Sequence, residues 1–439
     1  MSCLVAGFVG SGGVWSSVGR VSAQTPPPQV PVARGVTAGR PPATRPPGNL
    51  HRRSPLPNVV ILVAEGWVAS DLATNGASPN VERLAAEGVR WTRAYAGAPS
   101  ARVSREALLT GHHSGHGRLR GTNVSSLANE DVTVAEVFRA AGHRTAAVGV
   151  WDLGGNGTPG HPLRQGFSDW FGFLDAGEAR ELHPKAFWRN GKVFDNLIDT
   201  RGQLANYAPD WFARFATNYI QVHEDHPFLL YVSHPLPGGS DDPGIRSGHL
   251  AVWDRLVGAV VRELEQSRVR RETILVVAGT GAAGRSSDPL AESRLRVPLL
   301  FSWPGRIVPA GTQDRPVALW DVLPTVVELA GIPGPRSLDG VSLGFGMLPG
   351  TNAPGVAPKA PPPRAGGLYW ETAEVPPVRA VHWDRWKAVE TPAGGSLAVY
   401  DLEADPSATR DLAPANAGIV AEARRRLREA ADPLPAPHP

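Results

Sequence analysis

The sequence predicts an α/β fold in which a mostly parallel sheet lies between helices. The segment NVVILVA at residues 58–64 is a continuous apolar, β-branched run, which is typical of a strand buried on both faces of a parallel sheet. Similar runs then alternate with helical patterns along the chain, and this alternation indicates a layered α/β domain. A smaller antiparallel sheet is expected near the C-terminus.

The predicted elements follow one another in a regular order. Ser78 can cap the first helix, with Pro79 at its first position. Asp131 is expected to cap a second helix that ends at Gly142. The remaining predicted strands lie at residues 144–151, 227–234, 273–279 and 296–303, and a long helix is predicted at 249–266.

The amino-acid composition of the sequence changes near residue 350. A proline- and glycine-rich linker at 349–367 is expected to separate the α/β domain, residues 57–348, from a small C-terminal subdomain at 368–439 that ends in a disordered tail. Short aromatic and β-branched runs with turn residues between them predict its antiparallel sheet, and a helix is expected at 417–431. Its tryptophans are interpreted as core packing instead of a carbohydrate-stacking surface; they are Trp370, Trp383 and Trp386.

Composition restricts the possible partners and the location of the protein. The net charge of the 439 residues is only +3, with no run of like charges, which argues against a nucleic-acid surface. Cys3 is the single cysteine, so no disulfide framework or thiolate metal site is expected. No stretch beyond the N-terminal segment reaches the roughly 20 apolar residues that a membrane span needs.

The N-terminal residues predict export. Residues 1–23 combine an apolar stretch with small residues at the spacing that signal peptidase reads, which indicates a periplasmic or secreted protein. Because the first residues contain no Lys or Arg, a displaced start or a disordered tail is the alternative. Residues 24–56 are rich in proline and arginine and are expected to form a disordered linker.

Seven separate blocks between Pro57 and about Ala413 carry a family resemblance: PNVERLAAEGVRWTRAY, SREALLTGHHSGH, GNGTPGHPLRQGF, RVPLLFSWPGRI, DVLPTVVELAGIP, LDGVSL and VYDLEADPSATRDLA. With these blocks the chain resembles the sulfatase family of the alkaline phosphatase superfamily, and within it arylsulfatase A-type bacterial enzymes. The resemblance implies an alkaline-phosphatase-like α/β domain that carries the site, and a small C-terminal α+β domain that closes over it. It also implies sulfate ester hydrolysis by a formylglycine hydrate held against Ca²⁺, the formylglycine being made from Cys or Ser in a C/S-x-P-S-R motif.

Aligned on that motif, the segment APSARVSREALLTG lacks the nucleophile. Ser104 and Arg105 fix the register, so the family proline falls on Val103 and the nucleophile falls on Ala101, whose methyl group cannot attack a substrate. Ser104 is interpreted as the N-cap of the following helix. Arg105 and Arg102 remain as candidates for anion binding, with pairing to a nearby carboxylate as the alternative for Arg105.

The positions that match the family's calcium ligands have also changed. Ala64 and Glu65 stand where the family has Asp-Asp, and Gly279 and Thr280 stand where it has Asp-Asn. A hard cation needs six or more oxygen ligands with sufficient negative charge, so neither calcium nor another cofactor is expected here. Glu65 is expected to be a solvated residue at the end of a strand, with a surviving metal ligand as the alternative.

The positions that match the family's charge-stabilising groups are altered as well. Val150 replaces a lysine that contacts the sulfate, Asp152 adds a negative charge, and Gly238 replaces a histidine. The HAH segment of the nearest relatives becomes residues 178–180, and the loop before residues 296–298 contains no lysine. Because the scaffold blocks persist while the site positions differ, we expect a protein with impaired catalysis.

Other histidines receive a more ordinary interpretation. His113 and His116 match histidines that are common in this subgroup, and they are interpreted as polar packing residues because no set of metal ligands is visible around them. His234 follows the end of a predicted strand and is a further candidate for anion binding, although no partner is visible in the sequence.

Three functional hypotheses follow. The favoured one is an exported, catalytically impaired sulfatase homologue whose pocket or surface binds a ligand or partner, such as a sulfated glycan or another anionic ligand. The second is a working hydrolase with an unorthodox nucleophile, for which Ser104 or His234 would have to face the pocket beside a base. The third is a structural or interaction protein in which the pocket has closed.

Overall fold

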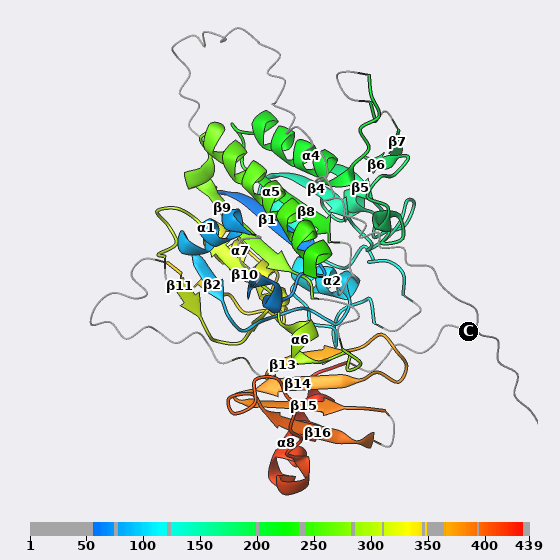
Figure 1. Ribbon diagram of the computed structural model, residues 1–439, viewed down its shortest axis with the longest axis vertical. Coiled ribbons are helices and arrows are strands. Elements are labelled where there is room, and N and C mark those ends of the chain that lie inside the picture. The colour runs from blue at the N-terminus through cyan, green and yellow to red at the C-terminus, as the bar shows by residue number, and fades with distance from the viewer. Residues whose placement is uncertain are drawn as a thin grey trace, which may run out of the picture. The chain divides into compact units, whose positions relative to one another are not determined.

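A ten-stranded sheet forms the centre of the α/β domain and confirms the predicted mostly parallel core (Figure 1). Five neighbouring parallel strands make up its middle, in the order β9 (Thr273–Gly279), β1 (Asn58–Glu65), β8 (Phe228–Pro235), β4 (Arg144–Val150) and β5 (Asp169–Phe173). Shorter strands extend the two edges: β10 (Leu299–Ser302), β2 (Val89–Trp91) and β11 (Gly311–Gln313) beyond β9, and β6 (Phe187–Arg189) and β7 (Lys192–Phe194) beyond β5. The strand predicted at 296–303 is present as β10, but it runs antiparallel to β9.

The structure is a computed structural model, and all the residues it describes belong to one compact unit. The described residues are 56–73, 78–120, 124–195, 197–198, 202–236, 243–281, 286–309, 311–344, 347–348, 364, 366–392 and 395–432. The predicted export signal, all but one residue of the linker after it and the predicted C-terminal tail lie outside this set, as does most of the linker predicted at 349–367.

Alternate residues of β1 face two different layers of helices. Val59, Ile61 and Val63 belong to the core cluster on one face, together with residues of α2 (Ala101–Thr110), α3 (Val134–Ala140) and α7 (Val322–Ala330). Val60, Leu62 and Ala64 belong to the cluster on the other face, with α1 (Pro79–Ala86), α4 (Ala208–Val222) and α5 (Pro243–Gln266). Helices α4 and α5 lie side by side on that second face (Figure 1). Because both faces are covered, every residue of this strand apart from its last one is buried, which explains the unbroken apolar run.

The starts of two helices differ from the predicted caps. Ser78 occupies the N-cap position of α1, but its side chain makes no capping hydrogen bond. The cap of α3 is Thr133, which forms a capping box with Glu136, and the prediction of Asp131 is wrong. The Asp131 carboxylate instead pairs with the guanidinium of Arg118 and accepts a hydrogen bond from a loop N–H. Asp131 and Thr133 are both residue types that cap helices, and the choice depends on which side chain reaches a backbone N–H.

The C-terminal subdomain is a four-stranded antiparallel sheet with one helix, as predicted. Its elements are β13 (Leu368–Glu371), β14 (Arg379–Trp383), β15 (Trp386–Glu390), β16 (Leu397–Asp401) and α8 (Ala417–Glu429). Trp370 and Trp383 are buried and Trp386 is half-buried in the packing around this sheet. Their interpretation as core residues is therefore confirmed.

Buried ion pairs fasten the small sheet to the α/β domain. Arg120 donates two hydrogen bonds, of 2.6 and 3.2 Å, to the Glu371 carboxylate of β13. The Lys387 ammonium of β15 donates to Glu292 at 2.8 Å, and the Tyr95 hydroxyl donates to the same carboxylate at 2.9 Å. Removing one member of such a pair leaves a buried charge without a partner, so these contacts fix how the two sheets meet.

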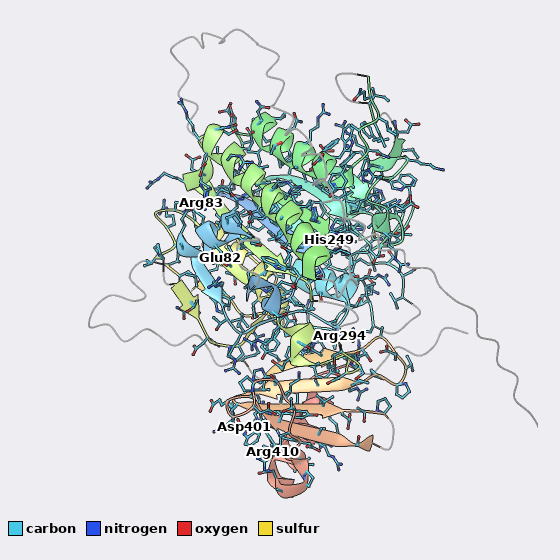
Figure 2. All side chains as sticks on the ribbon, viewed as in Figure 1. Glu82, Arg83, His249, Arg294, Asp401 and Arg410 are labelled. Atoms are coloured by element: carbon cyan, nitrogen blue, oxygen red, sulfur yellow. The ribbon has the colours of Figure 1, made fainter. Side chains whose placement is uncertain are left out.

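The remaining elements are short. They are β3 (Ala94–Tyr95), β12 (Val317–Ala318), α6 (Glu292–Leu295) and the 3-10 turns η1 (Ala69–Ala73), η2 (Pro162–Arg164), η3 (Glu178–Arg180), η4 (Arg270–Glu272), η5 (Leu319–Asp321) and η8 (Ala413–Ala415). Among the described residues, no helix is long and apolar enough to cross a membrane. The two charged residues of α1, Glu82 and Arg83 (Figure 2), pair with Arg90 and Glu265, respectively.

Candidate functional site

The segment that resembles the nucleophile motif forms the beginning of α2. The helix starts at Ala101 with Ser100 at the N-cap position, so the prediction that Ser104 caps it is wrong. Ser104 lies inside the helix and is fully buried. Its hydroxyl accepts a hydrogen bond from the Ala98 N–H at 3.1 Å and donates one to the Ala98 carbonyl at 2.9 Å. Ser104 therefore closes the loop before α2 and does not point into a pocket.

Arg105 is held by an ion pair with Glu65, the last residue of β1. The Arg105 side chain is 1% exposed, and one of its terminal nitrogens donates to a carboxylate oxygen of Glu65. Its other terminal nitrogen donates to the Trp151 carbonyl at 2.7 Å. The Ser233 hydroxyl donates to the same Glu65 oxygen at 3.0 Å. Of the two alternatives for Arg105, the structure contains the pair with a carboxylate, and the expectation of a solvated Glu65 is wrong.

The charges around this pair balance one another. Arg102, half-buried at the start of α2, donates from Nε to the Asp152 carbonyl at 2.9 Å. Burial raises the pKa of the Asp152 carboxyl, while the charges of Arg105 and Arg102 oppose that shift. Two guanidinium groups thus lie near two carboxyl groups, and an anion would have to compete with Glu65 for Arg105.

The residues at the family's metal positions do not fit a calcium ion. The Thr280 hydroxyl accepts a hydrogen bond from the Gly66 N–H at 3.1 Å, and the Thr280 N–H donates to the Ala64 carbonyl at 3.1 Å, so the ends of β9 and β1 are tied to each other. A side chain at Gly279 would place its Cβ 2.3 Å from the carbonyl oxygen of Trp67. Only Glu65 supplies a carboxylate at the four positions, and it already binds a guanidinium.

His234 is enclosed and uncharged. It lies on β8 opposite Ala64, is 1% exposed, and neither ring nitrogen has a hydrogen-bond partner among the described residues. Burial lowers the pKa of His234 to about 3. Its ring packs against Trp253, with the ring centroids 5.6 Å apart. His234 consequently offers no positive charge to an anion.

A cluster that the sequence did not reveal joins the two histidines after α2 to Asp339. The His116 Nδ1 lies 2.8 Å from one Asp339 oxygen, and the backbone N–H of His113 donates to the other oxygen at 3.0 Å. The two imidazole rings stack with centroids 4.4 Å apart, and the His113 Nδ1 accepts a hydrogen bond from the Gly115 N–H at 3.1 Å. Burial lowers the pKa of His113 to about 4.

This cluster is better described as a packed hydrogen-bonding network than as a metal centre. One ligand atom from each of His113, His116 and Asp339 lies within 4.8 Å of the others. A metal ligand needs a free lone pair aimed at the ion, however, and a neutral imidazole whose Nδ1 accepts a hydrogen bond carries its proton on Nε2. The interpretation of the two histidines as packing residues therefore agrees with the geometry. Asp339 is far away in the sequence, within the LDGVSL block, and spacing could not connect it to them.

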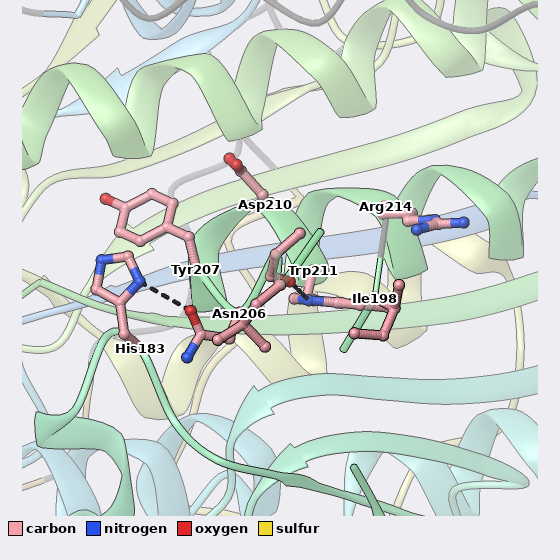
Figure 3. A pocket seen from close by; sticks show the side chains of 9 residues that line it. His183, Ile198, Asn206, Tyr207, Asp210, Trp211 and Arg214 are labelled. Carbon is pink, nitrogen blue, oxygen red and sulfur yellow. Dashed lines mark hydrogen bonds between the residues drawn. The ribbon is translucent and has the colours of Figure 1, made fainter. Parts of the chain in front are cut away.

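A cavity of about 230 Å³ lies at the start of α4 (Figure 3). Tyr207, Asp210, Trp211 and Arg214 line it from the helix side, and His183 lines it from the preceding loop. None of these residues was singled out by the sequence, because a mixture of aromatic and polar residues at the start of a helix has no distinctive spacing.

Two family models match the chain. Residues 57–237 match the model described as Sulfatase, and residues 289–432 match the model described as N-sulphoglucosamine sulphohydrolase, C-terminal. Among curated relatives, arylsulfatase G of Rattus norvegicus is 27% identical over 66% of this chain and 68% of its own length. Arylsulfatase A of Homo sapiens is 28% identical over 85% of this chain and 86% of its own length.

Solved structures show the same fold. Ps i-CgsB in complex with k-i-k-neocarrahexaose has a TM-score of 0.70 and 23% identity, covering 85% of this chain and 92% of that one. A protein in complex with its substrate D-glucosamine-2-N,6-O-disulfate has a TM-score of 0.69 and 17% identity, covering 85% and 97%. Phosphonate monoester hydrolase of Agrobacterium radiobacter has a TM-score of 0.63 and 19% identity, covering 85% and 95%. The motif blocks, the two family models and the shared architecture agree, and the chain belongs to the sulfatase family of the alkaline phosphatase superfamily.

Proposed function

We propose that this sulfatase-family protein is catalytically impaired and binds a sulfated glycan or another anionic ligand instead of hydrolysing it. The observation that carries the proposal concerns two positions on α2. Ala101 occupies the position of the nucleophile, and Arg105, one turn further along, is engaged by Glu65. At these two positions, therefore, neither a nucleophile nor an unpaired guanidinium remains.

The energy available from the remaining groups supports this view. A single positioned hydrogen-bond donor contributes about 3 to 4 kcal/mol to a transition state. Enzymes generally lower their barriers by about 8 to 23 kcal/mol. Arg105 alone falls well short of that range, even before its attraction to Glu65 is overcome.

We propose in addition that the protein binds no calcium at the family position. The tie between Thr280 and Gly66 and the short distance that a side chain at Gly279 would have to Trp67 support this. Export to the periplasm or the medium is proposed from the N-terminal pattern of residues 1–23.

The proposed ligand class is supported by the ligands of two structural neighbours. The two structural neighbours named above in complex with sugars, one of them a disulfated glucosamine, support a carbohydrate ligand. Because the charge of Arg105 is balanced, the ligand would be held by groups outside the former sulfate position.

The alternative of a working hydrolase with an unorthodox nucleophile has less support. It required Ser104 or His234 to face a pocket, whereas the Ser104 hydroxyl makes two hydrogen bonds to Ala98 and the His234 ring is enclosed. A closed former pocket, as in the third hypothesis, is compatible with ligand binding elsewhere on the surface.

Turnover of an aryl sulfate and an aryl phosphate with added Ca²⁺ tests the proposal. The unmodified chain is compared with an Ala101→Cys/Val103→Pro variant, which restores the C-x-P-S-R motif, matured by co-expressed formylglycine-generating enzyme, and we expect no turnover by either. Turnover by the unmodified chain that disappears in an identically purified Arg105→Ala variant would overturn the proposal. Turnover by the matured variant alone would show that the metal site and charge-stabilising groups are still competent, and would also contradict it.

A further inference from the structure

The cavity at the start of α4 opens at the same edge of the sheet as Glu65 and Arg105. Helix α4 leads through a short turn into β8, so the two elements run in opposite directions, and α4 begins at the edge where β8 ends. Glu65 at the end of β1 pairs with Pro235 at the end of β8. Ligands of α/β sheets bind outside the carboxyl ends of the strands, so this cavity has a suitable position.

Aromatic rings form part of the cavity wall. The half-buried Tyr207 ring lies against His183, with ring centroids 5.0 Å apart, and the Trp211 ring carries the Arg214 guanidinium 5.2 Å from its centroid. The Trp211 Nε1 donates to the Ala205 carbonyl at 2.5 Å, which fixes the indole. Ile198 and Leu204, 50% and 69% exposed, add apolar surface to the wall. Such a wall favours a ligand with an apolar face.

Two polar side chains of the cavity are held in place, and others keep capacity for hydrogen bonds. The Asn206 side chain bridges the loop, with its oxygen 3.2 Å from the His183 Nδ1 and its nitrogen donating to the Pro184 carbonyl at 3.0 Å. This contact makes Nδ1 of His183 the donor and leaves Nε2 as an acceptor. Among the described residues, none hydrogen-bonds the carboxylate of Asp210 or the hydroxyl of Tyr207.

The charges and the size narrow the ligand class. Among the residues that line the cavity, Asp210 and Arg214 carry opposite charges, and the Arg255 guanidinium beyond the wall acts on Asp210 as well, so the lining itself has no net charge to attract a sulfate group. Its volume of about 230 Å³ is below the roughly 300–1,000 Å³ of pockets for drug-sized ligands, which leaves room for a single small ring. A pyranose has an apolar face of C–H groups and a rim of hydroxyls that both donate and accept, and it matches this set.

We propose that this cavity binds one uncharged pyranose ring of a glycan, with its C–H face against Tyr207 and its hydroxyls hydrogen-bonded to Asp210 and His183. The inference rests on the proposed glycan-binding function and locates the glycan in the cavity at the start of α4. Sulfate groups on neighbouring sugars would lie outside the cavity.

Isothermal titration of the full chain with tetrasaccharides prepared from chondroitin sulfate, heparan sulfate and κ-carrageenan, each sulfated and desulfated, tests the inference. The variants are Asp210→Asn, Tyr207→Phe and Tyr207→Ala, and the control is Glu181→Gln, an exposed acid on the same loop that does not line the cavity. Thermal melting of each variant checks that it is folded. We expect at least one tetrasaccharide to bind with and without sulfate, about tenfold or more weakly to Asp210→Asn and Tyr207→Ala, and unchanged to the control.

The outcomes separate this inference from the proposed function. Binding that is equal in the cavity variants and the control would overturn the cavity assignment and leave glycan binding intact. Binding that needs sulfate and survives in all variants would place an anion site elsewhere and would also overturn it. No binding of any tetrasaccharide would contradict both the cavity and the glycan, while sulfatase turnover by the unmodified chain contradicts only the loss of catalysis.

Discussion

Replacing Glu65 with glutamine should destabilise the protein strongly and create an anion site. The change keeps the shape of the side chain but leaves the Arg105 guanidinium, 1% exposed, without its counter-charge. Breaking a buried ion pair by removing one partner costs about 3 to 5 kcal/mol. The Arg105 bond to the Trp151 carbonyl and the Ser233 hydroxyl beside residue 65 both remain, so we expect the lower part of that range. Urea unfolding with linear extrapolation measures the difference.

The matched control is the cycle that also removes the guanidinium. Arg105→Met alone leaves Glu65 with only its hydrogen bond from Ser233, whereas Glu65→Gln with Arg105→Met removes both charges. The double variant should lose less stability than the two single variants together, with a coupling of about 1 to 3 kcal/mol. Inorganic sulfate should stabilise Glu65→Gln more than the unmodified chain, because only in the variant has Arg105 lost its paired carboxylate. A cost below about 1 kcal/mol for Glu65→Gln, which is typical of exposed pairs, would refute the view that this pair locks the site.

Three further measurements follow from the described contacts. Stability should fall as the pH drops below 6.5, on the order of 1 kcal/mol per pH unit for each of His234 and His113. Their folded pKa values are about 3 and 4, so between these values and pH 6.5 only the unfolded chain takes up the protons. His234→Leu should flatten this slope in urea titrations at a series of pH values, and an unchanged slope would contradict the burial of His234 as a neutral ring. Ser104→Ala should cost about 1 to 3 kcal/mol in urea unfolding by leaving the Ala98 N–H and carbonyl unpaired, whereas a neutral result would mean that the hydroxyl is dispensable. Thr133→Ala should lower the free energy of unfolding by about 1 kcal/mol because it removes the capping hydrogen bond, whereas Ser78→Ala should change it little. Equal losses in thermal or urea unfolding would contradict the difference between the two caps.

The same pH argument has an opposing contribution from the cluster at Asp339. The hydrogen bond to Asp339 raises the pKa of His116, so its stabilising effect is present below pH 6.5 and is lost as the pH rises through the folded value. His116 therefore opposes the slope only above pH 6.5, and in acid, where both states carry its proton, it adds a constant stabilisation. Replacing His116 with glutamine should lower stability below pH 6.5 by a nearly constant amount and leave the acid slope from His234 and His113 unchanged.

The fold was readable because burial leaves a direct trace in the sequence. The run from Val59 to Ala64 is apolar throughout because both faces of β1 are covered, and the alternating runs around Trp370 and Trp383 gave the small sheet. Helix starts were harder to predict, because Asp131 and Thr133 are both good capping residues and the choice depends on which side chain reaches a backbone N–H. Antiparallel pairing of β10 with β9 was likewise invisible, since an apolar run carries no direction.

Only part of the candidate site could be predicted from the sequence. The alignment of Ser104 and Arg105 with the family motif predicts, from the sequence alone, that Ala101 occupies the position of the nucleophile. The partner of Arg105 could not be found in the same way, because Glu65 and Arg105 are 40 residues apart in the sequence, and two helical segments, two short strands and their loops lie between them. Glu65 reaches α2 because it has the same parity along β1 as Val63, which faces that helix layer. The sequence thus predicts which groups are absent, and the fold shows which contacts the remaining groups make.

The changes at the two strand ends depend on one another, and this limits how the site could be rebuilt. A buried carboxylate needs a positive partner. With only Glu65 left at the four positions, Arg105 supplies that partner, and Thr280 ties β9 to Gly66. A restored nucleophile at residue 101 would therefore face a guanidinium that is already neutralised. A restored carboxylate at residue 279 would first have to move the Trp67 backbone, because its Cβ would lie 2.3 Å from that carbonyl. We propose that catalysis requires several of these contacts to change together, so the matured Ala101→Cys/Val103→Pro variant should stay inactive.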